Sequence, residues 1–216
     1  MNAAAVTDAS AAGIVVLGVL MAVTVSIGRS IWLLAAQSAL VAAIALGVGL
    51  GQQAQHLVIA GALTMGAKAV VVPLILMVML RASPVRVERH PYVGRRFSLV
   101  IAIGIVFASS VAVADIVLPQ SPGGARALPS ALAEVLTGLL LVMSRRKAIS
   151  LLVGLLVFEN GLAMTAFVLA PGMPLVVELG ILFDVLIAVV VGWVYTRRML
   201  RVLGTTSSDG MRRLRG

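Results

Sequence analysis

Residues 145–169 read Arg145-Arg-Lys-Ala-Ile-Ser-Leu-Leu-Val-Gly-Leu-Leu-Val-Phe-Glu159-Asn-Gly-Leu-Ala-Met-Thr-Ala-Phe-Val-Leu169. The part from Ala148 to Leu169 is apolar apart from a few residues and, at about 1.5 Å per helical residue, crosses a hydrocarbon core of about 30 Å. Glu159 lies near its middle, where a charged side chain costs roughly 2.5 to 3.5 kcal/mol. The stretch therefore predicts a membrane helix whose carboxyl group has a partner or a task.

The composition of the whole chain is that of an integral membrane protein. Of its 216 residues 61% are hydrophobic and 12% are charged, and the mean hydropathy is +1.11. The net charge of +9 comes from Lys and Arg between apolar runs, which is typical of topology signals and not of a nucleic-acid-binding domain. With no Cys and only His56 and His90, we expect no metal, iron–sulfur or haem cofactor. No basic region precedes the first apolar run, so we expect no cleaved signal peptide.

Apolar runs predict an all-α protein with seven membrane-spanning helices. The fifth run is short for a bilayer, and turn residues separate the others. The predicted spans are Ala11–Ile27, Ile31–Leu50, Leu57–Leu80, Phe97–Leu118, Leu128–Met143, Ala148–Leu169 and Leu175–Tyr195.

The positions of the basic residues support seven spans. Fifteen Lys and Arg residues fall on one side, in the loop Arg81–Arg96, at Arg29, at Arg145–Lys147 and in the tail, whereas Arg126 stands alone on the other. This bias predicts a multi-pass protein of the cell (inner, cytoplasmic) membrane, with its N-terminus outside and its C-terminus in the cytoplasm. Without the short fifth span, the tail arginines and the loop Arg81–Arg96 would face opposite sides.

Two further ionisable residues lie at mid-membrane. Lys68 is near the middle of the third span, and Pro73 removes the helix hydrogen bond to the carbonyl of Ala69, so we expect a kink beside Lys68. Asp184 lies near the middle of the seventh span, and Glu178 is about 9 Å nearer its outer end.

A weak internal repeat is suggested by these positions. Lys68 precedes Arg81 by thirteen residues, and Asp184 precedes Arg197 by thirteen. Two parallel three-helix units joined by the fourth span would explain this spacing. The expected divisions are residues 1–96 for the first unit with its basic loop, 97–127 for the linking helix and outer loop, 128–203 for the second unit, and 204–216 for a mobile basic tail.

The polar residues in the spans allow two interpretations. Lys68, Glu159 and Asp184 could lock helices together, or they could relay protons. We favour the relay, because a polar pair between membrane helices contributes only ~0.6 to 2 kcal/mol, which is less than the cost of burying its charges. Glu134 and Glu178 are placed nearer the outer ends of their spans, either as water-exposed helix ends or as an exit path. The loop Arg81–Arg96 is expected to touch anionic lipid as topological charge, or else to dock a peripheral subunit.

Several motifs resemble known families. Arg145-Arg-Lys with Gly154, Leu155, Asn160, Leu162, Ala163 and Phe167 resembles the start of the K subunit of respiratory complex I, and Asp184 before Arg197-Arg198 looks like its last-helix carboxylate. The whole chain, including Lys68-Ala-Val-Val-Val-Pro73, Phe158-Glu-Asn-Gly161 and Val177-Glu-Leu-Gly180 with Asp184, is similar to the membrane component E of hydrogenase-4. The chain departs from the K subunit at Leu156, where that subunit carries a glutamate; Glu159 follows one turn later on a similar face.

The resemblance implies a non-catalytic membrane subunit of a group 4 nickel–iron hydrogenase or formate hydrogenlyase-like complex related to complex I. In such a complex a peripheral arm performs the redox chemistry, and membrane carboxylates and lysines carry protons or couple to ion pumping. Lys68, Glu159 and Asp184 would be relay groups, with Glu178 and Glu134 beside them. The alternatives are a K/C-like subunit of a multi-subunit cation/proton antiporter, and a structural membrane scaffold.

Overall fold

The computed structural model of the chain describes residues 3–83, 86–88, 91–116, 124–169, 190, 192–194 and 197. These residues form long helices joined by short connections. The elements are α1 (Ala3–Val23), α2 (Ile27–Gly51), α3 (Gln55–Gly66), η1 (Ala67–Val71), α4 (Val72–Ala82), α5 (Arg95–Ala112), α6 (Gly124–Ser144) and α7 (Ala148–Leu169). The helix α7 has the bounds that the sequence predicts.

Within the described residues, six helices are long and apolar enough to cross a membrane, with α3, η1 and α4 forming one continuous span. The chain is therefore an all-helical multi-pass membrane protein. The seventh predicted span lies mostly outside the described residues. Of its described residues, Gly192 lies against α7, where a Cβ atom would come within 2.7 Å of Leu152 Cδ1.

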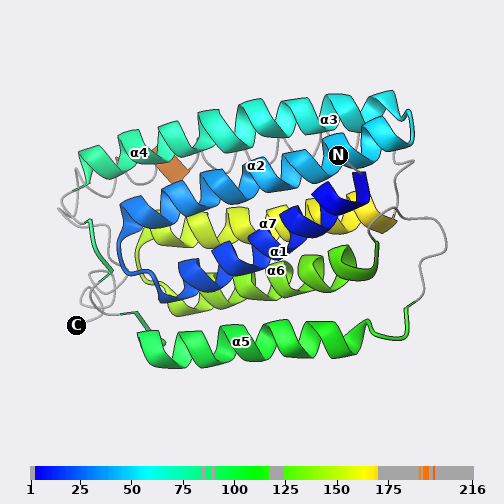
Figure 1. Cartoon of the computed structure of the whole chain (residues 1–216). Helices are drawn as coiled ribbons and strands as arrows, with labels where there is room; N and C mark the ends of the chain where they lie inside the picture. The colour runs from blue at the N-terminus through cyan, green and yellow to red at the C-terminus, as the bar shows by residue number, and fades with distance from the viewer. Residues whose placement is uncertain are drawn as a thin grey trace, which may run out of the picture.

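Four helices, α1, α2, α6 and α7, form the centre of the bundle (Figure 1). The span α3–η1–α4 packs along α2, and α5 packs on α6 and α1 on the opposite side of the bundle. Two clusters of buried apolar side chains hold the centre, one around Ile14, Ile44 and Met164 and the other around Met21, Leu76 and Val157.

The backbones of α6 and α7 come into direct contact at glycines. A Cβ atom at Gly138 would lie 2.3 Å from the Phe158 nitrogen, and one at Gly161 would lie 2.6 Å from the Val135 nitrogen. Small residues allow such approach in membranes, where dispersion contacts and hydrogen bonds replace the hydrophobic driving force. Because α7 also carries Glu159, this contact fixes the position of the site.

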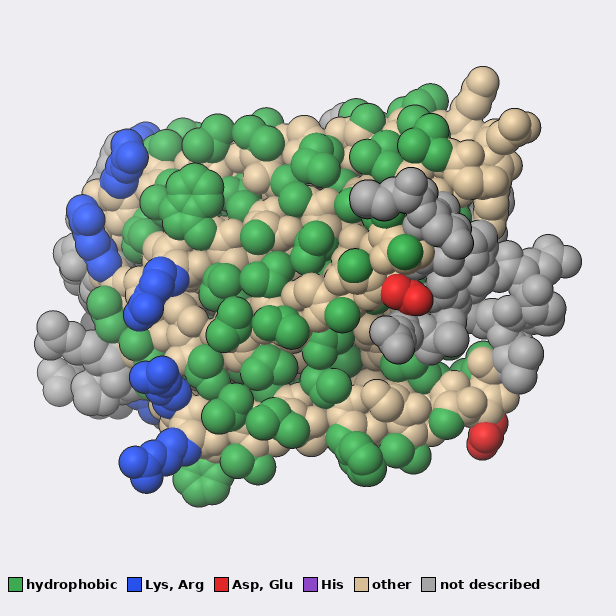
Figure 2. Space-filling model, viewed as in Figure 1, with side chains coloured by type: hydrophobic (Ala, Val, Ile, Leu, Met, Phe, Trp, Pro, Cys, Tyr) green, Lys and Arg blue, Asp and Glu red, His purple; other side chains and the backbone are tan. Residues whose placement is uncertain are grey.

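The fifth predicted span was too short. The sequence predicts Leu128–Met143, but α6 runs from Gly124 to Ser144, across Pro129. Its 21 residues are enough to cross a bilayer. Lys and Arg side chains gather at one end of the face seen in Figure 2, called here the basic end. This end holds the connections α1–α2, α4–α5 and α6–α7, and the described Lys and Arg residues in or beside these connections are Arg29, Arg81, Arg86, Arg95, Arg96, Arg145, Arg146 and Lys147.

Candidate functional site

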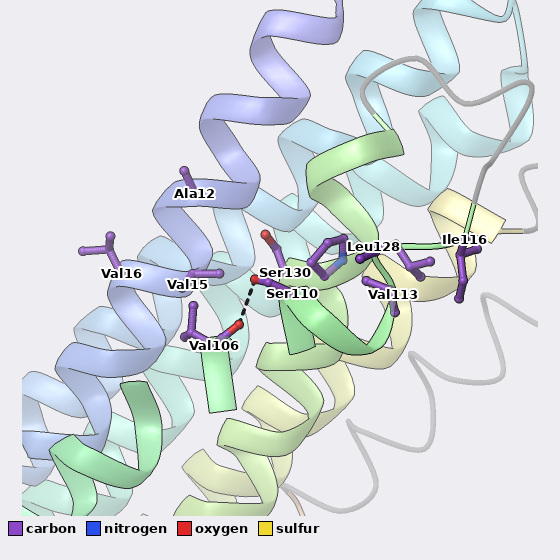
Figure 3. A pocket seen from close by; sticks show the side chains of 11 residues that line it. Ala12, Val15, Val16, Val106, Ser110, Val113, Ile116, Leu128 and Ser130 are labelled. Atoms are coloured by element: carbon purple, nitrogen blue, oxygen red, sulfur yellow. Dashed lines mark hydrogen bonds between the residues drawn. The ribbon is translucent and has the colours of Figure 1, made fainter. Parts of the chain in front are cut away.

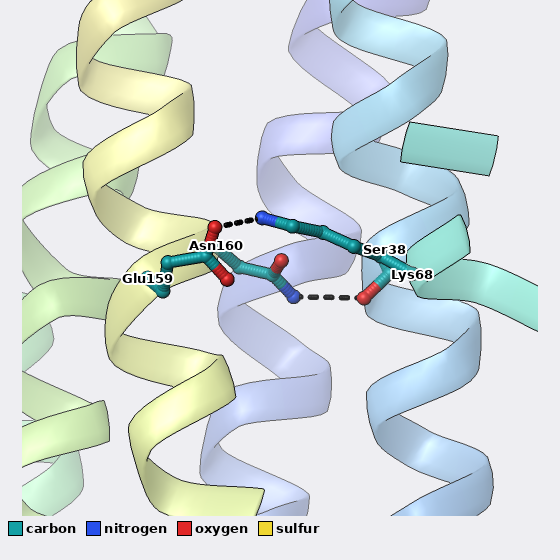
Figure 4. Close-up of polar contacts among 4 residues, drawn as sticks. All are labelled: Ser38, Lys68, Glu159 and Asn160. Atoms are coloured by element: carbon teal, nitrogen blue, oxygen red, sulfur yellow. Dashed lines mark hydrogen bonds and ion pairs between the residues drawn. The ribbon is translucent and has the colours of Figure 1, made fainter. Parts of the chain in front are cut away.

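Lys68 and Glu159 form an ion pair inside the bundle. The Lys68 ammonium donates to Glu159 Oε1 from η1 to α7, and the two residues are only 4% and 9% exposed (Figure 4). The sequence predicts both at mid-membrane, and the structure shows that they are partners. Removing two charges from water is costly, so the pair persists only with good geometry.

The helix that carries Lys68 has an unusual turn. Residues Ala67–Val71 form a π-helix, and the Val72 N–H donates to the Ala67 carbonyl, one residue further back than in an α-helix. Pro73 follows directly; it lacks an N–H, and its ring crowds the carbonyl four residues earlier. The sequence predicts a kink here, and the observed change is a widened turn of the kind that often occurs at functional sites.

A neutral contact adjoins this ion pair. Asn160 Nδ2 donates to Ser38 Oγ over 3.0 Å, which joins α7 to α2 (Figure 4). Both side chains are buried. Asn160 therefore binds a neighbouring helix through its side-chain amide.

Glu134 and Gln37 form a third buried contact. Gln37 Nε2 donates to Glu134 Oε1 and, over 3.3 Å, to the carbonyl oxygen of Ile14 in α1. Glu134 is 1% exposed and is the eleventh of the 21 residues of α6. The sequence prediction that Glu134 lies nearer the outer end, as a possible water-exposed helix end, is therefore wrong. The helix begins four residues earlier than predicted, which moves Glu134 to its middle.

These three contacts lie at one depth. Gln37 follows the start of α2 by ten residues, Glu159 follows the start of α7 by eleven, and Glu134 precedes the end of α6 by ten. At 1.5 Å per residue, each is about 15 to 17 Å from the basic end, and Lys68 is about 21 Å from it. We call Gln37, Ser38, Lys68, Glu134, Glu159 and Asn160 the polar layer.

Two acceptor atoms of the polar layer have no hydrogen-bond partner among the described residues. Gln37 Oε1 and Glu159 Oε2 are buried acceptors for which the described residues supply no donor. A buried acceptor without a donor is costly, and water or a proton is the usual solution. Gln37 Oε1 and Glu159 Oε2 are therefore two atoms of the layer at which a water molecule or a proton could bind.

Asp184 and Glu178 lie outside the described residues, so their predicted roles stay predictions. Sequence reasoning also missed Gln37 and Ser38. The available signal was a Gln-Ser pair in the middle of an otherwise apolar span. Among the described residues, no three His, Asp or Glu side chains gather as a metal ion would require.

A second polar cluster closes the basic end. Arg145 Nη2 donates to the carbonyl oxygens of Met21 (2.8 Å) and Ala22 (3.2 Å), in the last turn of α1. Carbonyls there have no partner within the helix, and a cation suits the negative end of the helix dipole. Burial lowers the pKa of Arg145, and the nearby Glu88 carboxylate acts in the opposite direction.

The basic loop is held against the bundle by this cluster. Glu88 is 2% exposed, and its Oε1 accepts from the Arg146 backbone N–H over 2.9 Å. The Tyr92 N–H donates to the Ser144 carbonyl over 2.8 Å, and the Arg146 guanidinium lies 4.1 Å from the centre of the Tyr92 ring. The described part of Arg81–Arg96 is thus packed against the ends of the helices.

An apolar cleft of about 580 Å³ lies between α1, α5 and α6 (Figure 3). Val15, Val106 and Leu128 are among its lining residues, and Ser110 in the wall donates to its own helix at the Val106 carbonyl over 2.9 Å. The lining contains no titratable side chain, so the cleft is chemically separate from the polar layer.

Comparison with known proteins identifies relatives along most of the chain. An uncharacterized protein of Mycobacterium tuberculosis is 35% identical over 216 residues, which cover 99% of this chain and 98% of the relative. Hydrogenase-4 component E of Escherichia coli is 31% identical over 163 residues, 76% of each chain. The chain belongs to the hydrogenase-4 component E family. No family model and no solved structure matches this component E homologue.

Membership of the component E family confirms the resemblance stated from the Lys–Pro, Glu-Asn-Gly and Glu…Asp motifs. In this component E homologue Lys68 of the first motif binds Glu159 of the second in the polar layer, where Asn160 also lies. The resemblance to the complex I K subunit stays a prediction.

Proposed function

We propose that this chain is a membrane subunit of a hydrogenase complex related to complex I, and that its polar layer takes part in proton translocation or in coupling redox chemistry to ion movement. The relative in Escherichia coli is named as a component of hydrogenase-4, which supports the first part. The second part is carried by the buried Lys68–Glu159 pair. Ionisable residues at this depth are functional by default, because their burial is costly.

The chemistry of the pair suits a relay. Transfer of one proton from Lys68 Nζ to Glu159 Oε1 converts two opposite charges into a neutral amine and a neutral carboxylic acid. Burial penalises the charged forms while their mutual attraction favours them, so a small movement of either helix changes the balance. The π-turn at Lys68 and Glu159 Oε2, which has no hydrogen-bond partner among the described residues, both give the pair freedom to change partners.

The proposed relay includes further carboxyl groups. Asp184 and Glu178 in the seventh predicted span would extend it, and Glu134 lies in the polar layer itself. In this proposal the chain has no catalytic centre of its own. Its partners are other membrane subunits, peripheral cytoplasmic subunits that dock on Arg81–Arg96, and anionic lipid in the cytoplasmic membrane.

We also propose that the bundle is a duplicated unit. Helices α1 and α6 each have 21 residues, and a three-residue connection follows each of them. Helix α1 packs on α6, and α2 packs on α7, as expected for two copies related by an axis along the membrane normal. The Lys68–Glu159 pair would then join the two copies.

Purification of the tagged chain in mild detergent, followed by mass spectrometry of co-purifying proteins, tests the complex. We expect nickel–iron hydrogenase subunits together with iron–sulfur partners. The alternative interpretations give different results: antiporter subunits without redox partners would identify the chain as an antiporter component. Either that result or the absence of partners would overturn the hydrogenase proposal.

A further inference from the structure

The contacts of the polar layer follow one another along neighbouring residues. Lys68 binds Glu159, the next residue Asn160 binds Ser38, and the residue before Ser38, Gln37, binds Glu134. Glu134 is thus at the other end of this series from Lys68. Its Oε1 accepts from Gln37, which also bonds the Ile14 carbonyl, so α2 ties α6 to α1 at this point. Its Oε2 faces Gly18 of α1, where a Cβ atom would lie only 2.9 Å away. The carboxyl group is therefore held between an amide on one side and a bare backbone on the other.

The charged groups around Glu134 are few. The helices packed against α6 carry Asp8 in α1, Arg95 and Arg96 in α5, and Glu159 in α7. Arg95 and Arg96 begin α5 at the basic end, and Glu159 is already bound to Lys68. On α2, the contact to Glu134 is the neutral Gln37. In the described part of the chain, Glu134 thus differs from Glu159, because its hydrogen-bonding partner carries no charge.

A purely structural contact at this position would not need an acid. A glutamine at residue 134 could accept the same hydrogen bond from Gln37 Nε2 through its own Oε1, without the cost of burying an ionisable group. What the carboxyl group adds is the capacity to bind and release a proton. Gln37 Oε1 has no donor among the described residues, so it can accept that proton in a hydrogen bond after a rotation of the side chain.

We propose that Glu134 is a second proton-binding group, separate from the Lys68–Glu159 pair, and that Gln37 and Gly18 are its positioning residues. The proposal rests on the proposed function for the use that is made of the proton. The proton moves between water and a Glu134 oxygen, and the Gln37 amide fixes the carboxyl group in both states. Gly18 leaves the space into which Oε2 points.

Infrared spectroscopy of the full chain in lipid nanodiscs, recorded against pH and in heavy water, tests this directly. We expect a carboxylic-acid carbonyl band that titrates and that disappears in Glu134→Gln. In Gln37→Leu, which removes the amide at similar size, the band should change frequency and its titration midpoint should move by about one pH unit, the effect of one hydrogen bond.

Two further variants sharpen the test. Gly18→Ala removes no polar group, and the nearest atom to the added methyl group is Oε2 at the end of the Glu134 side chain, not a backbone atom, so the bundle should fold while the band shifts. Ser109→Ala is the matched control, because Ser109 is fully buried in α5 with no hydrogen-bond partner in the described residues. In this variant the Glu134 carboxylic-acid band should keep the frequency and midpoint of the parent. The proposal is overturned if Glu134→Gln removes no titrating band. It is equally overturned if folded Gln37→Leu and Gly18→Ala both keep the parent midpoint and frequency.

These outcomes are independent of the hydrogenase proposal. The infrared measurement uses the chain alone, so failure to capture hydrogenase subunits would not affect it. Conversely, a Glu134 band that never titrates would remove Glu134 from the proposed relay but leave the co-purification result and the role of the Lys68–Glu159 pair unaffected.

Discussion

At the scale of single residues, replacements of Lys68 and Glu159 distinguish a structural scaffold from a proton relay. A buried ion pair is weak evidence for stability, because apolar residues of similar volume often replace it at little cost. Removing one partner alone is different, since it leaves an uncompensated charge at mid-membrane. Stability and proton coupling therefore respond differently to single and double replacements.

We predict that Lys68→Met and Glu159→Leu each lower the free energy of unfolding by about 3 to 5 kcal/mol, because the remaining group stays buried without its partner. The double variant should recover to within roughly 1 kcal/mol of the parent. Denaturant unfolding of the purified chain in lipid nanodiscs measures this. If Lys68 and Glu159 form a relay, the double variant should also assemble and still fail to couple; full proton coupling in it would identify the pair as a structural lock.

Some residues of the polar layer could be predicted from the sequence and others could not. Lys68 and Glu159 were predictable because a charge inside an apolar run is conspicuous and its depth can be counted. Gln37 and Ser38 were not, because neutral polar residues in a membrane helix fit many packings. Glu134 was misplaced because the residues up to Arg126 look like a connection before the helix, yet α6 begins at Gly124 and includes Arg126.

At the scale of the elements, the contact between α6 and α7 controls the geometry of the polar layer, because these helices carry Glu134, Glu159 and Asn160. The contact depends on Gly138, whose Cα faces the Phe158 backbone. Overpacking a close contact typically costs about 1 to 3 kcal/mol. Backbone atoms cannot move aside as a flexible side chain can, so the helices themselves must separate.

We predict that Gly138→Ala lowers the free energy of unfolding by about 2 kcal/mol or more. Gly104→Ala in α5 is its matched control: nothing lies within 4 Å of the added methyl group, so alanine's better helix propensity should raise stability by up to about 1 kcal/mol. Thermal and denaturant unfolding of both variants measures the difference. Equal stability of the two would contradict the close α6–α7 contact.

The first and last residues of a helix were predictable only where the sequence changes sharply from charged to apolar residues. Residues 148–169 follow three basic residues, and the predicted span coincides with α7. The predicted starts of α1 and α2 were late because hydropathy ignores the small and polar residues that helices include at their ends. The π-turn at Lys68 depends on how Pro73 redistributes hydrogen bonds, so the sequence could predict a distortion there but not its form.

At the scale of the whole molecule, the two ends of the bundle differ chemically. Basic side chains gather at one end (Figure 2). There Arg145, Arg146 and Glu88 connect the loop to the helix ends. At the opposite end, which holds the connection Gly51–Ala54 and the first turn of α6, Arg126 is the single Lys or Arg among the described residues. Basic residues are retained on the cytoplasmic side during insertion, so we predict from this asymmetry that the basic end faces the cytoplasm.

The absence of cysteine makes that orientation directly measurable. Gln52 lies exposed in the turn after α2, and Arg86 lies exposed in the basic loop, where it uses its backbone carbonyl, not its side chain, to bind the Ile27 N–H over 3.2 Å. Cysteine at either position should therefore leave the fold intact. We predict that a membrane-impermeant maleimide labels Gln52→Cys on intact cells and Arg86→Cys only after the membrane is opened, while the cysteine-free parent stays unlabelled. The reverse pattern would show that the basic end faces outward. The loop Arg81–Arg96 would then lie away from any cytoplasmic redox subunit, and a peripheral subunit could not dock on it.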